Sequence, residues 1–214
     1  PSCVFGDPQG SRTVVLLGDS HAAMWMGAIV SIGHRQHWKV IVLTKTSCPA
    51  VSLELFRPLL FGRNLVNAAY PECGKWLSSA LARINELAPD AVLISHCNGC
   101  ESMVDSEGKL FRRPDWATGL TKTLERITAP TTKKIVLGDT PRWSGSLDCL
   151  ALNPDQLQEC SRATGMVTGV TYNDVERAVA EASGATFIDV TPWFCGSVCT
   201  TRFRPNARRA STIW

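Results

Sequence analysis

The sequence lacks long apolar stretches: no run in its 214 residues reaches the roughly 18 uninterrupted apolar residues that a membrane-spanning helix needs. It also lacks a secretory leader. The chain opens Pro1-Ser2-Cys3 with no charged segment before an apolar run, so we expect any export signal to lie upstream. An excess of one charge is missing as well. A formal net charge of +3, without Lys/Arg runs interleaved with aromatic residues, argues against nucleic acid as a partner.

Cysteine, by contrast, is abundant, with nine residues in the chain. Six of them form three pairs that bracket short segments: Cys48 and Cys73, Cys149 and Cys160, and Cys195 and Cys199. Such pairs are typical of disulfides in an oxidising compartment, although spacing alone leaves the connectivity open. The odd count leaves one thiol over, and Cys3 is the candidate to have lost an upstream partner. We therefore expect an extracytoplasmic protein.

Short β-branched runs alternate with helical patterns, which predicts an α/β fold. The predicted strands are 13–17, 39–43, 91–95, 134–137 and 186–190, and the predicted helices are 21–33, 72 or 74 to 87, 114–127 and 172–183. This alternation favours a parallel sheet with helices on both faces and chemistry beyond the carboxyl ends of the strands. We expect segment 51–71 to be loop with some helix. One domain over residues 1–214, with an atypical tail over 200–214, is the simplest interpretation.

The strongest chemical signal is a serine just after the first predicted strand, in Leu17-Gly18-Asp19-Ser20-His21. A serine between a buried strand and a helix is exposed at the carboxyl edge of the sheet. The helix N-terminus offers backbone N–H groups to an oxyanion formed there. Both features suit acyl transfer through a serine ester, with Ser20 as the nucleophile. The structural alternative is that Ser20 only caps the helix.

Several segments together resemble one family. Gly18-Asp19-Ser20 resembles the first motif of the SGNH (GDSL-like) hydrolases. The resemblance sharpens to SGNH domains fused to membrane acyltransferase-3 proteins through Thr46-Ser47-Cys48-Pro49, Cys73-Gly74-Lys75-Trp76, Gly138-Asp139-Thr140-Pro141-Arg142 and Trp193-Phe194-Cys195 with Cys199. It implies a three-layer flavodoxin-like sheet and a serine esterase or O-acyltransferase acting on cell-surface polysaccharide, with no cofactor and no metal.

The resemblance also implies an oxyanion hole, which the family builds from a Gly backbone N–H and an Asn side chain. This chain has no glycine in 44–48, so a backbone N–H near Ser47 would have to serve. Asn98, in Cys97-Asn98-Gly99 after the third predicted strand, falls near the position of the family's Asn. Its other interpretation is a turn residue in an Asn-Gly pair. Asp19 belongs to the Ser20 motif and is carried over as a site residue with it.

The family closes with an Asp-x-x-His pair that supplies and orients the general base, and this sequence does not contain one. Its tail, 200–214, holds four arginines and no Asp, Glu or His, so we hypothesise a truncated, frame-shifted or diverged end. We expect His21 to point elsewhere on its helix and His34 and His37 to lie on the surface. His96 remains as a substitute base. Loss of the triad base lowers rates by several orders of magnitude, so we expect reduced or absent activity.

Cys97-Asn98-Gly99-Cys100 is a lone CxxC motif. A zinc ribbon needs a second such pair, and a thioredoxin-type pair sits at a helix N-terminus, so a loop disulfide or two buried thiols is favoured. Asp139, after the fourth predicted strand, either faces the site or serves as a turn or cap residue. Trp143, in the loop beyond that strand, is a candidate for lining a sugar-binding cleft.

Two functions therefore remain open. One is an enzyme that moves an acyl group to or from a carbohydrate hydroxyl through Ser20. The other is an inactive SGNH module that binds carbohydrate or docks on a membrane acyltransferase. The resemblance implies an acyltransferase-3 membrane domain as partner, in the same or another chain, and tethering to the cell membrane through a segment absent here. A nucleotide-binding domain is disfavoured because no glycine-rich phosphate loop follows the first strand.

Overall fold

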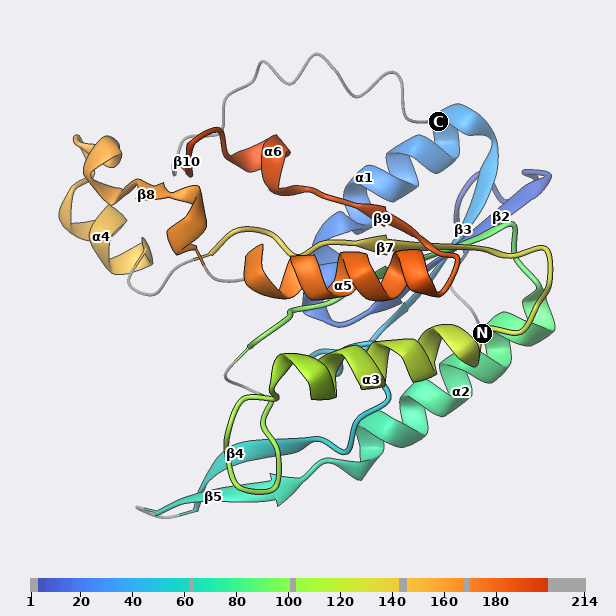
Figure 1. Ribbon diagram of the computed structural model, residues 1–214. Coiled ribbons are helices and arrows are strands. Elements are labelled where there is room, and N and C mark those ends of the chain that lie inside the picture. The colour runs from blue at the N-terminus through green and yellow to red at the C-terminus, as the bar shows by residue number, and fades with distance from the viewer. Residues whose placement is uncertain (1–3, 62–63, 101–102, 143–145, 168–169, 200–214) are drawn as a thin grey trace.

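A six-stranded sheet forms the centre of the molecule in the computed structural model, which describes residues 4–61, 64–100, 103–142, 146–167 and 170–199 (Figure 1). The strand order is β1-β3-β2-β6-β7-β9. The members are β1 (Val4–Gly6), β2 (Arg12–Gly18), β3 (Trp38–Thr44), β6 (Ala91–Ser95), β7 (Lys133–Leu137) and β9 (Thr186–Ile188). All neighbours run parallel except β1, which pairs antiparallel with β3. The five predicted strands are confirmed.

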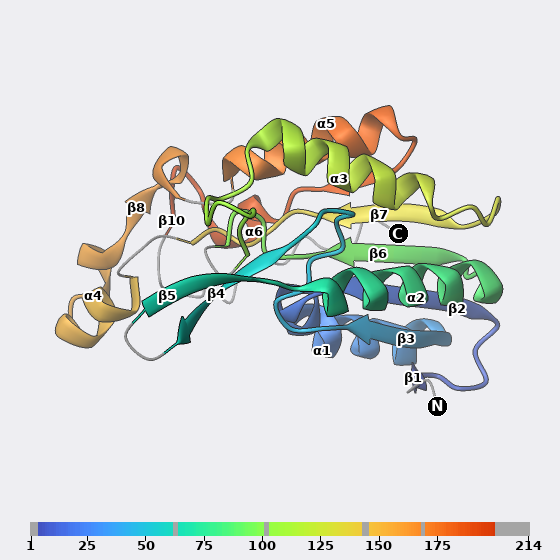
Figure 2. The same ribbon diagram turned by 90° about the horizontal axis from the view of Figure 1, so that it is seen from below.

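Two helical layers cover the sheet, as Figures 1 and 2 show. The helices are α1 (Ser20–Gln36), α2 (Pro71–Leu87), α3 (Arg113–Glu125) and α5 (Val170–Ala182), which confirms the four predicted helices. Alternate residues of β2 enter different cores. Val15 and Leu17 pack with α2, α3 and α5, whereas Val14 and Leu16 pack with α1. A strand that is apolar on both faces needs this three-layer arrangement, and the predicted flavodoxin-like α/β fold is confirmed.

The segment predicted as loop with some helix forms a β-hairpin instead. β4 (Phe56–Phe61) pairs antiparallel with β5 (Asn64–Ala69), with Phe56 opposite Ala69. Both strands belong to a two-stranded sheet and are therefore edges, where a proline such as Pro58 is tolerated because its missing N–H can face away from the partner strand. The presence of Pro and Asn in the segment favoured loop, and the short edge hairpin tolerates both.

Smaller elements gather with this hairpin at the carboxyl edge of the sheet (Figure 2). They are α4 (Ser146–Leu152), two short 3-10 helices (Leu157–Cys160 and Thr164–Met166), β8 (Arg162–Ala163), α6 (Thr191–Phe194) and β10 (Val198–Cys199). β8 and β10 form a two-stranded antiparallel sheet. These insertions follow strands β7 and β9, so they surround the edge at which Ser20 lies.

Four disulfides connect the described cysteines: Cys48–Cys73, Cys97–Cys100, Cys149–Cys160 and Cys195–Cys199. The three bracketing pairs and the loop disulfide of the CxxC motif are confirmed. Cys3 lies outside the described residues. Four disulfides in this part of the chain fit an oxidising, extracytoplasmic compartment.

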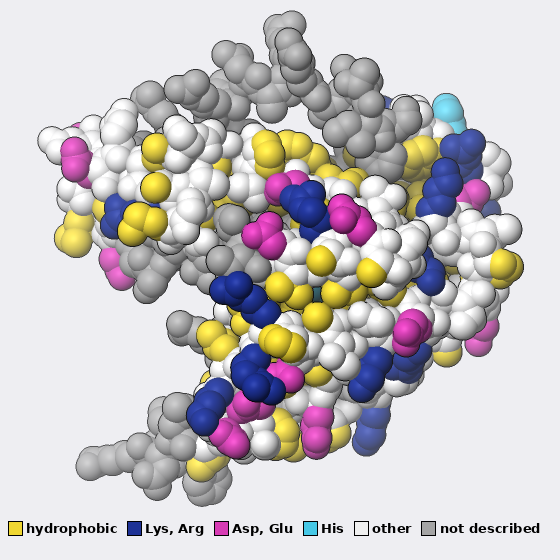
Figure 3. Space-filling model, viewed as in Figure 1, with side chains coloured by type: hydrophobic (Ala, Val, Ile, Leu, Met, Phe, Trp, Pro, Cys, Tyr) yellow, Lys and Arg dark blue, Asp and Glu magenta, His cyan; other side chains and the backbone are white. Residues whose placement is uncertain are grey.

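The surface is mixed in charge. On the face that includes α3 and α5, Lys and Arg side chains are interspersed with Asp and Glu (Figure 3). No described helix combines the length and the apolar composition needed to cross a bilayer.

Candidate active site

Ser20 is the first residue of α1 and follows β2 after a single intervening residue. That residue, Asp19, is the N-cap of the helix, and its Oδ1 accepts a hydrogen bond of 2.8 Å from the backbone N–H of His21. The capping role therefore falls to Asp19, and the alternative that Ser20 serves as the cap is wrong. Ser20 is exposed at the N-terminus of a 17-residue helix, where the helix dipole and free backbone N–H groups favour negative charge.

Gly18 is the last residue of the central strand β2. Its backbone conformation and its closeness to the neighbouring strand both exclude a residue with a side chain. Its φ is +150°, and a Cβ built there would lie 1.7 Å from the carbonyl oxygen of Ser95 on the neighbouring strand β6. Glycine therefore lets β2 and β6 run side by side to the point where the chain turns into α1.

Asp19 also fixes the loop that follows β6. Its Oδ2 accepts a hydrogen bond of 2.9 Å from the backbone N–H of Cys97, and its side chain is buried with a residue exposure of 1%. One carboxylate thus joins the turn that carries Ser20 to the loop that carries Asn98. These contacts make Asp19 a positioning residue in the structure.

Asp139 and His21 form an acid–imidazole pair beside the nucleophile position. Asp139 follows β7, is 1% exposed, and lies with its Oδ1 2.5 Å from Nδ1 of His21. Its Oδ2 accepts a hydrogen bond from the backbone N–H of Asn98 and another from the Arg142 guanidinium. His21 therefore reaches across to the loop after β7, contrary to the expectation that it points elsewhere on its helix. Because Nδ1 is engaged by Asp139, Nε2 is the ring nitrogen that has no hydrogen bond to another described residue.

Asn98 is completely buried at the Asn-Gly turn, in which Gly99 has a φ of +64°. Its Nδ2 donates a hydrogen bond of 2.8 Å to Oδ1 of Asn173 on α5, and its Oδ1 has no hydrogen-bond partner among the described residues. The amide has a second N–H, which is the group an oxyanion role would use. Asn98 thus occupies the turn position, and its oxyanion role stays a prediction.

Asn173 is a site residue that sequence reasoning missed. Its Oδ1 accepts a 2.8 Å hydrogen bond from the backbone N–H of Asp139, and its Nδ2 donates to the carbonyl of Asp139 at 3.0 Å. With the bond from Asn98, this side chain joins the loops after β6 and β7. The sequence signal that could have identified it is an Asn on the apolar face of a predicted amphipathic helix. The structure buries this residue, and a buried amide without partners would be costly.

The loop after β3 supplies the third wall of the site. The backbone N–H of Lys45 donates to the carbonyl of Gly18 at 3.0 Å, which holds this loop against the end of β2. Ser47 has a φ of +55°, in the left-handed region that glycine adopts most readily. The backbone at Ser47 therefore has a conformation suited to glycine, although this chain carries serine there.

His96 lies on the other side of the loop, inside the core beneath α3 and α5. Its Nε2 is 2.9 Å from Oε1 of Glu176, which also accepts a hydrogen bond of 2.9 Å from Nε1 of Trp116. Burial acts to lower the pKa of His96, but the charge and hydrogen bond of the buried Glu176 carboxylate raise it by more, so the pKa lies above its ordinary value. The residue is 1% exposed, and no residue that the structure describes forms a hydrogen bond with its Nδ1.

The remaining sequence candidates lie away from this edge or outside the described chain. His34 and His37 are exposed at the far end of α1, as expected, and Nδ1 of His37 is 2.8 Å from Asp7. Trp143 and the tail 200–214 fall outside the described residues. The described edge therefore brings together the end of β2 and the loops after β3, β6 and β7.

Comparison with known proteins identifies the family of the chain. The model of the SGNH domain fused to AT3 domains matches residues 1–208. The chain belongs to this family. No curated protein matches this SGNH domain.

Solved structures similar to this SGNH domain share its fold at low sequence identity. The periplasmic domain of a lipopolysaccharide acetyltransferase from Salmonella ser. Paratyphi A is 14% identical, with a TM-score of 0.67 over 94% of this chain and 74% of that one. A catalytic mutant of an acetylxylan esterase from Geobacillus stearothermophilus is 12% identical, with a TM-score of 0.50 over 86% of this chain and 78% of that one.

Proposed function

We propose that this SGNH domain transfers O-acyl groups, acetyl foremost, to or from hydroxyls of a cell-surface polysaccharide, through an ester on Ser20. The observation that carries the proposal is the exposed Ser20 at the N-terminus of α1, directly beyond the central strand. Family membership supports it. So do the activities of two neighbours of the same fold, a lipopolysaccharide acetyltransferase and an acetylxylan esterase.

The chemistry follows from the position of Ser20. Its Oγ attacks the carbonyl carbon of the acyl donor and loses its proton to a base, which leaves an oxyanion on the former carbonyl oxygen. The donor's alkoxide then departs with that proton, and the acyl group remains as a serine ester. In the second half, an acceptor hydroxyl or water attacks the ester and restores the serine.

Two groups are proposed to stabilise the oxyanion. One is the backbone around Ser47, whose left-handed conformation is the one that suits the family's glycine. The other is the second N–H of the Asn98 amide, held by the hydrogen bond to Asn173. Fixed N–H donors of this kind lower the barrier because they need no reorganisation when charge develops.

The general base is the weak part of the site, since the sequence contains no Asp-x-x-His. His96, the substitute proposed from sequence, has its Nε2 on Glu176 inside the core. The His21–Asp139 pair is better placed, because Asp139 holds Nδ1 and leaves Nε2 free. There is no direct hydrogen bond between the described Ser20 and His21 side chains, so proton transfer would use a bridging water. We therefore propose impaired but measurable acyl transfer.

A membrane acyltransferase-3 domain is the proposed partner. Family membership supports an arrangement in which that domain, in the same or another chain, presents the acyl group outside the cytoplasm. The four disulfides fit the same compartment. The tether would lie in a segment that this chain does not include.

Carbohydrate binding without catalysis is the second candidate, and one cluster favours it. Trp25 of α1 makes edge-to-face contacts with Trp193 and Phe194 of α6, with ring centroids 5.6 and 6.3 Å apart. Trp193 is 46% exposed and Phe194 is 37% exposed. Exposed aromatic rings of this kind stack on sugar rings. Binding of polysaccharide that is abolished by Trp193→Ala, in a chain that forms no serine ester, would select this function.

Acylation of the folded chain by p-nitrophenyl acetate, read by intact mass and peptide mapping, tests the enzymatic proposal. We expect one acetyl group on Ser20 and none in Ser20→Ala. His21→Ala should slow acylation, whereas the matched control His34→Ala, on the exposed far end of the same helix, should not. Acetylation only at lysines, unchanged in Ser20→Ala, would contradict acyl transfer through Ser20.

A further inference from the structure

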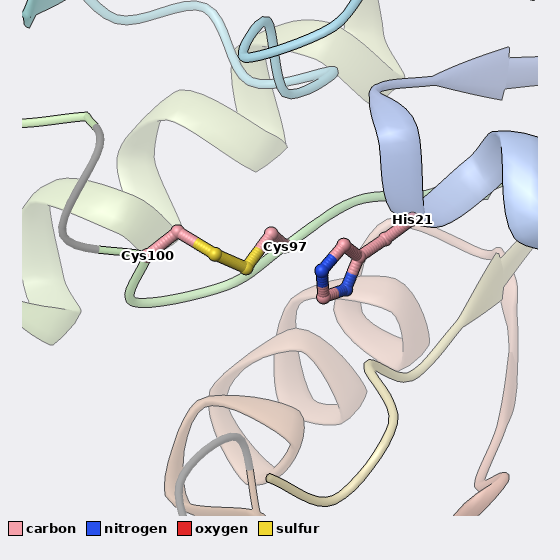
Figure 4. Close-up of side chains that lie close together, drawn as sticks. All are labelled: His21, Cys97 and Cys100. Atoms are coloured by element: carbon pink, nitrogen blue, oxygen red, sulfur yellow. A yellow bond between two sulfur atoms is a disulfide. The ribbon is translucent and has the colours of Figure 1, made fainter. Parts of the chain in front are cut away.

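The CxxC motif gains a third potential metal ligand from another part of the chain. His21, at the start of α1, lies beside Cys97 and Cys100 in the loop after β6, and Figure 4 shows its ring directed toward the two sulfur atoms. One donor atom from each of the three residues lies within 4.8 Å of the other two. A tetrahedral zinc site separates such donors by about 3.5–3.8 Å, given Zn–S and Zn–N bonds of about 2.3 and 2.0 Å. The two sulfur atoms are bonded to each other in this structure, so this spacing requires reduction of the disulfide together with side-chain rotation.

The orientation of His21 fits a metal ligand. Histidines that bind metals usually donate their other ring nitrogen to a carboxylate, which fixes the ring and raises its basicity. Asp139 lies 2.5 Å from Nδ1 of His21 and leaves Nε2 for a metal. This carboxylate is buried and also accepts the backbone N–H of Asn98, so its position is set by the fold.

The charge around the motif favours a cation. Asp19 accepts the backbone N–H of Cys97, and Asp139 accepts that of Asn98, so two buried carboxylates lie directly behind the loop. Arg142 offsets part of this charge. Cys97 is 2% exposed, while Cys100 and His21 are partly exposed, which gives an ion a path to an otherwise enclosed position.

We propose that His21, Cys97 and Cys100 form a redox-controlled site for Zn²⁺ or a similar thiophilic divalent cation, an assignment that does not rest on the proposed acyl transfer. In the oxidised chain the two cysteines form the disulfide that the structure shows. A dithiol reductant transfers two electrons and two protons to this disulfide and is itself oxidised to a disulfide. Zn²⁺ then displaces the two thiol protons and binds two thiolates and the imidazole, with its fourth position open to water or a small ligand.

Metal binding and proton transfer would use the same nitrogen of His21. The oxidised chain is therefore the form in which Nε2 remains available to act as a base. Reduction followed by zinc binding would withdraw it.

Zinc titration of the chain with and without a phosphine reductant tests the proposal, using a chromophoric chelator as competitor. We expect one Zn²⁺ per reduced chain and none at this site in the oxidised chain. His21→Ala should weaken binding at least about tenfold. Matched controls are His34→Ala and the double variant Cys149→Ser/Cys160→Ser, both of which should bind as the wild type does. Co²⁺ in place of Zn²⁺ should give thiolate-to-cobalt charge-transfer absorption that is lost in Cys97→Ser.

A second variant covers the case in which reduction of the other disulfides unfolds the chain. Cys100→His removes the Cys97–Cys100 disulfide and leaves a donor set of one thiolate and two imidazoles, so zinc binding is measurable under non-reducing conditions. Circular dichroism confirms that each variant is folded. Binding by Cys100→His that depends on His21 supports the site. A folded Cys100→His chain that binds no zinc, or a reduced wild type whose affinity is unchanged by His21→Ala, would overturn it.

Discussion

The buried pair of His96 and Glu176 gives a quantitative test of the packing beneath the site. The two residues are 1% and 0% exposed, and the only described hydrogen bonds of the Glu176 carboxylate, from His96 and Trp116, both fall on Oε1. Replacing His96 by Leu leaves a buried carboxylate with one donor. Breaking a buried pair in this way typically costs about 3–5 kcal/mol, so His96→Leu should lose stability in that range.

The double variant His96→Leu/Glu176→Leu separates charge from packing. It removes the unpaired carboxylate and leaves only the indole N–H of Trp116 without an acceptor, at a cost of about 1–3 kcal/mol. We therefore expect the double variant to be more stable than His96→Leu alone, by about 2 kcal/mol. Urea unfolding under non-reducing conditions, followed by far-ultraviolet circular dichroism, measures both values.

The direction in which folding stability changes with pH gives a further test of this pair. Because the folded-state pKa of His96 is raised above the ordinary value of about 6.5, its charged form stabilises the fold fully below that pH, and this contribution is lost as pH rises through the folded pKa. The stability difference between the wild type and His96→Leu should therefore shrink above about pH 6.5. A difference that grows with pH, or a double variant less stable than His96→Leu, would refute the assignment of a charged buried pair.

Three further changes test the site's framework. Gly18→Ala forces a Cβ to 1.7 Å from the Ser95 carbonyl oxygen and should cost about 2–5 kcal/mol or abolish soluble expression; wild-type stability would contradict the close approach of β2 and β6. Asn173→Ala removes the partner of three buried polar groups, the Asn98 amide and the backbone N–H and carbonyl of Asp139, and should cost at least about 3 kcal/mol in urea unfolding; a loss under about 1 kcal/mol would show that the bridge is dispensable. Replacing Cys48 and Cys73 by Ala opens a loop of 25-residue separation and should cost about 3.5 kcal/mol by calorimetry; unchanged stability would argue against that disulfide.

Local sequence patterns predicted the sheet and the position of Ser20 because both depend on short-range signals. An apolar run such as 13–17 followed by Gly18 predicts a buried strand from the local sequence alone. The hairpin of β4 and β5 was missed because its strands lie at an edge, where Pro58 and asparagines are compatible with either strand or loop.

The contacts that complete the site could not be predicted in the same way. His21 and Asp139 are 118 residues apart in the sequence, and Asn98 and Asn173 are 75 apart. Only the pairing of parallel strands in the sheet brings the residues of each pair together. The lone CxxC motif gave no metal signal in sequence for the same reason, since its potential third ligand comes from the helix after β2. His96 follows strand β6 as expected, yet its side chain enters the core because Glu176 and Trp116 provide partners there.

Labelling of the folded, oxidised chain by a fluorophosphonate probe tests the central claim most directly, because the probe reacts only with activated serines. We predict one label per chain on the wild type, accumulating slowly because the base is suboptimal, and none on Ser20→Ala. A folded wild type that takes no label, under conditions where a serine esterase control is fully labelled, would contradict an activated Ser20.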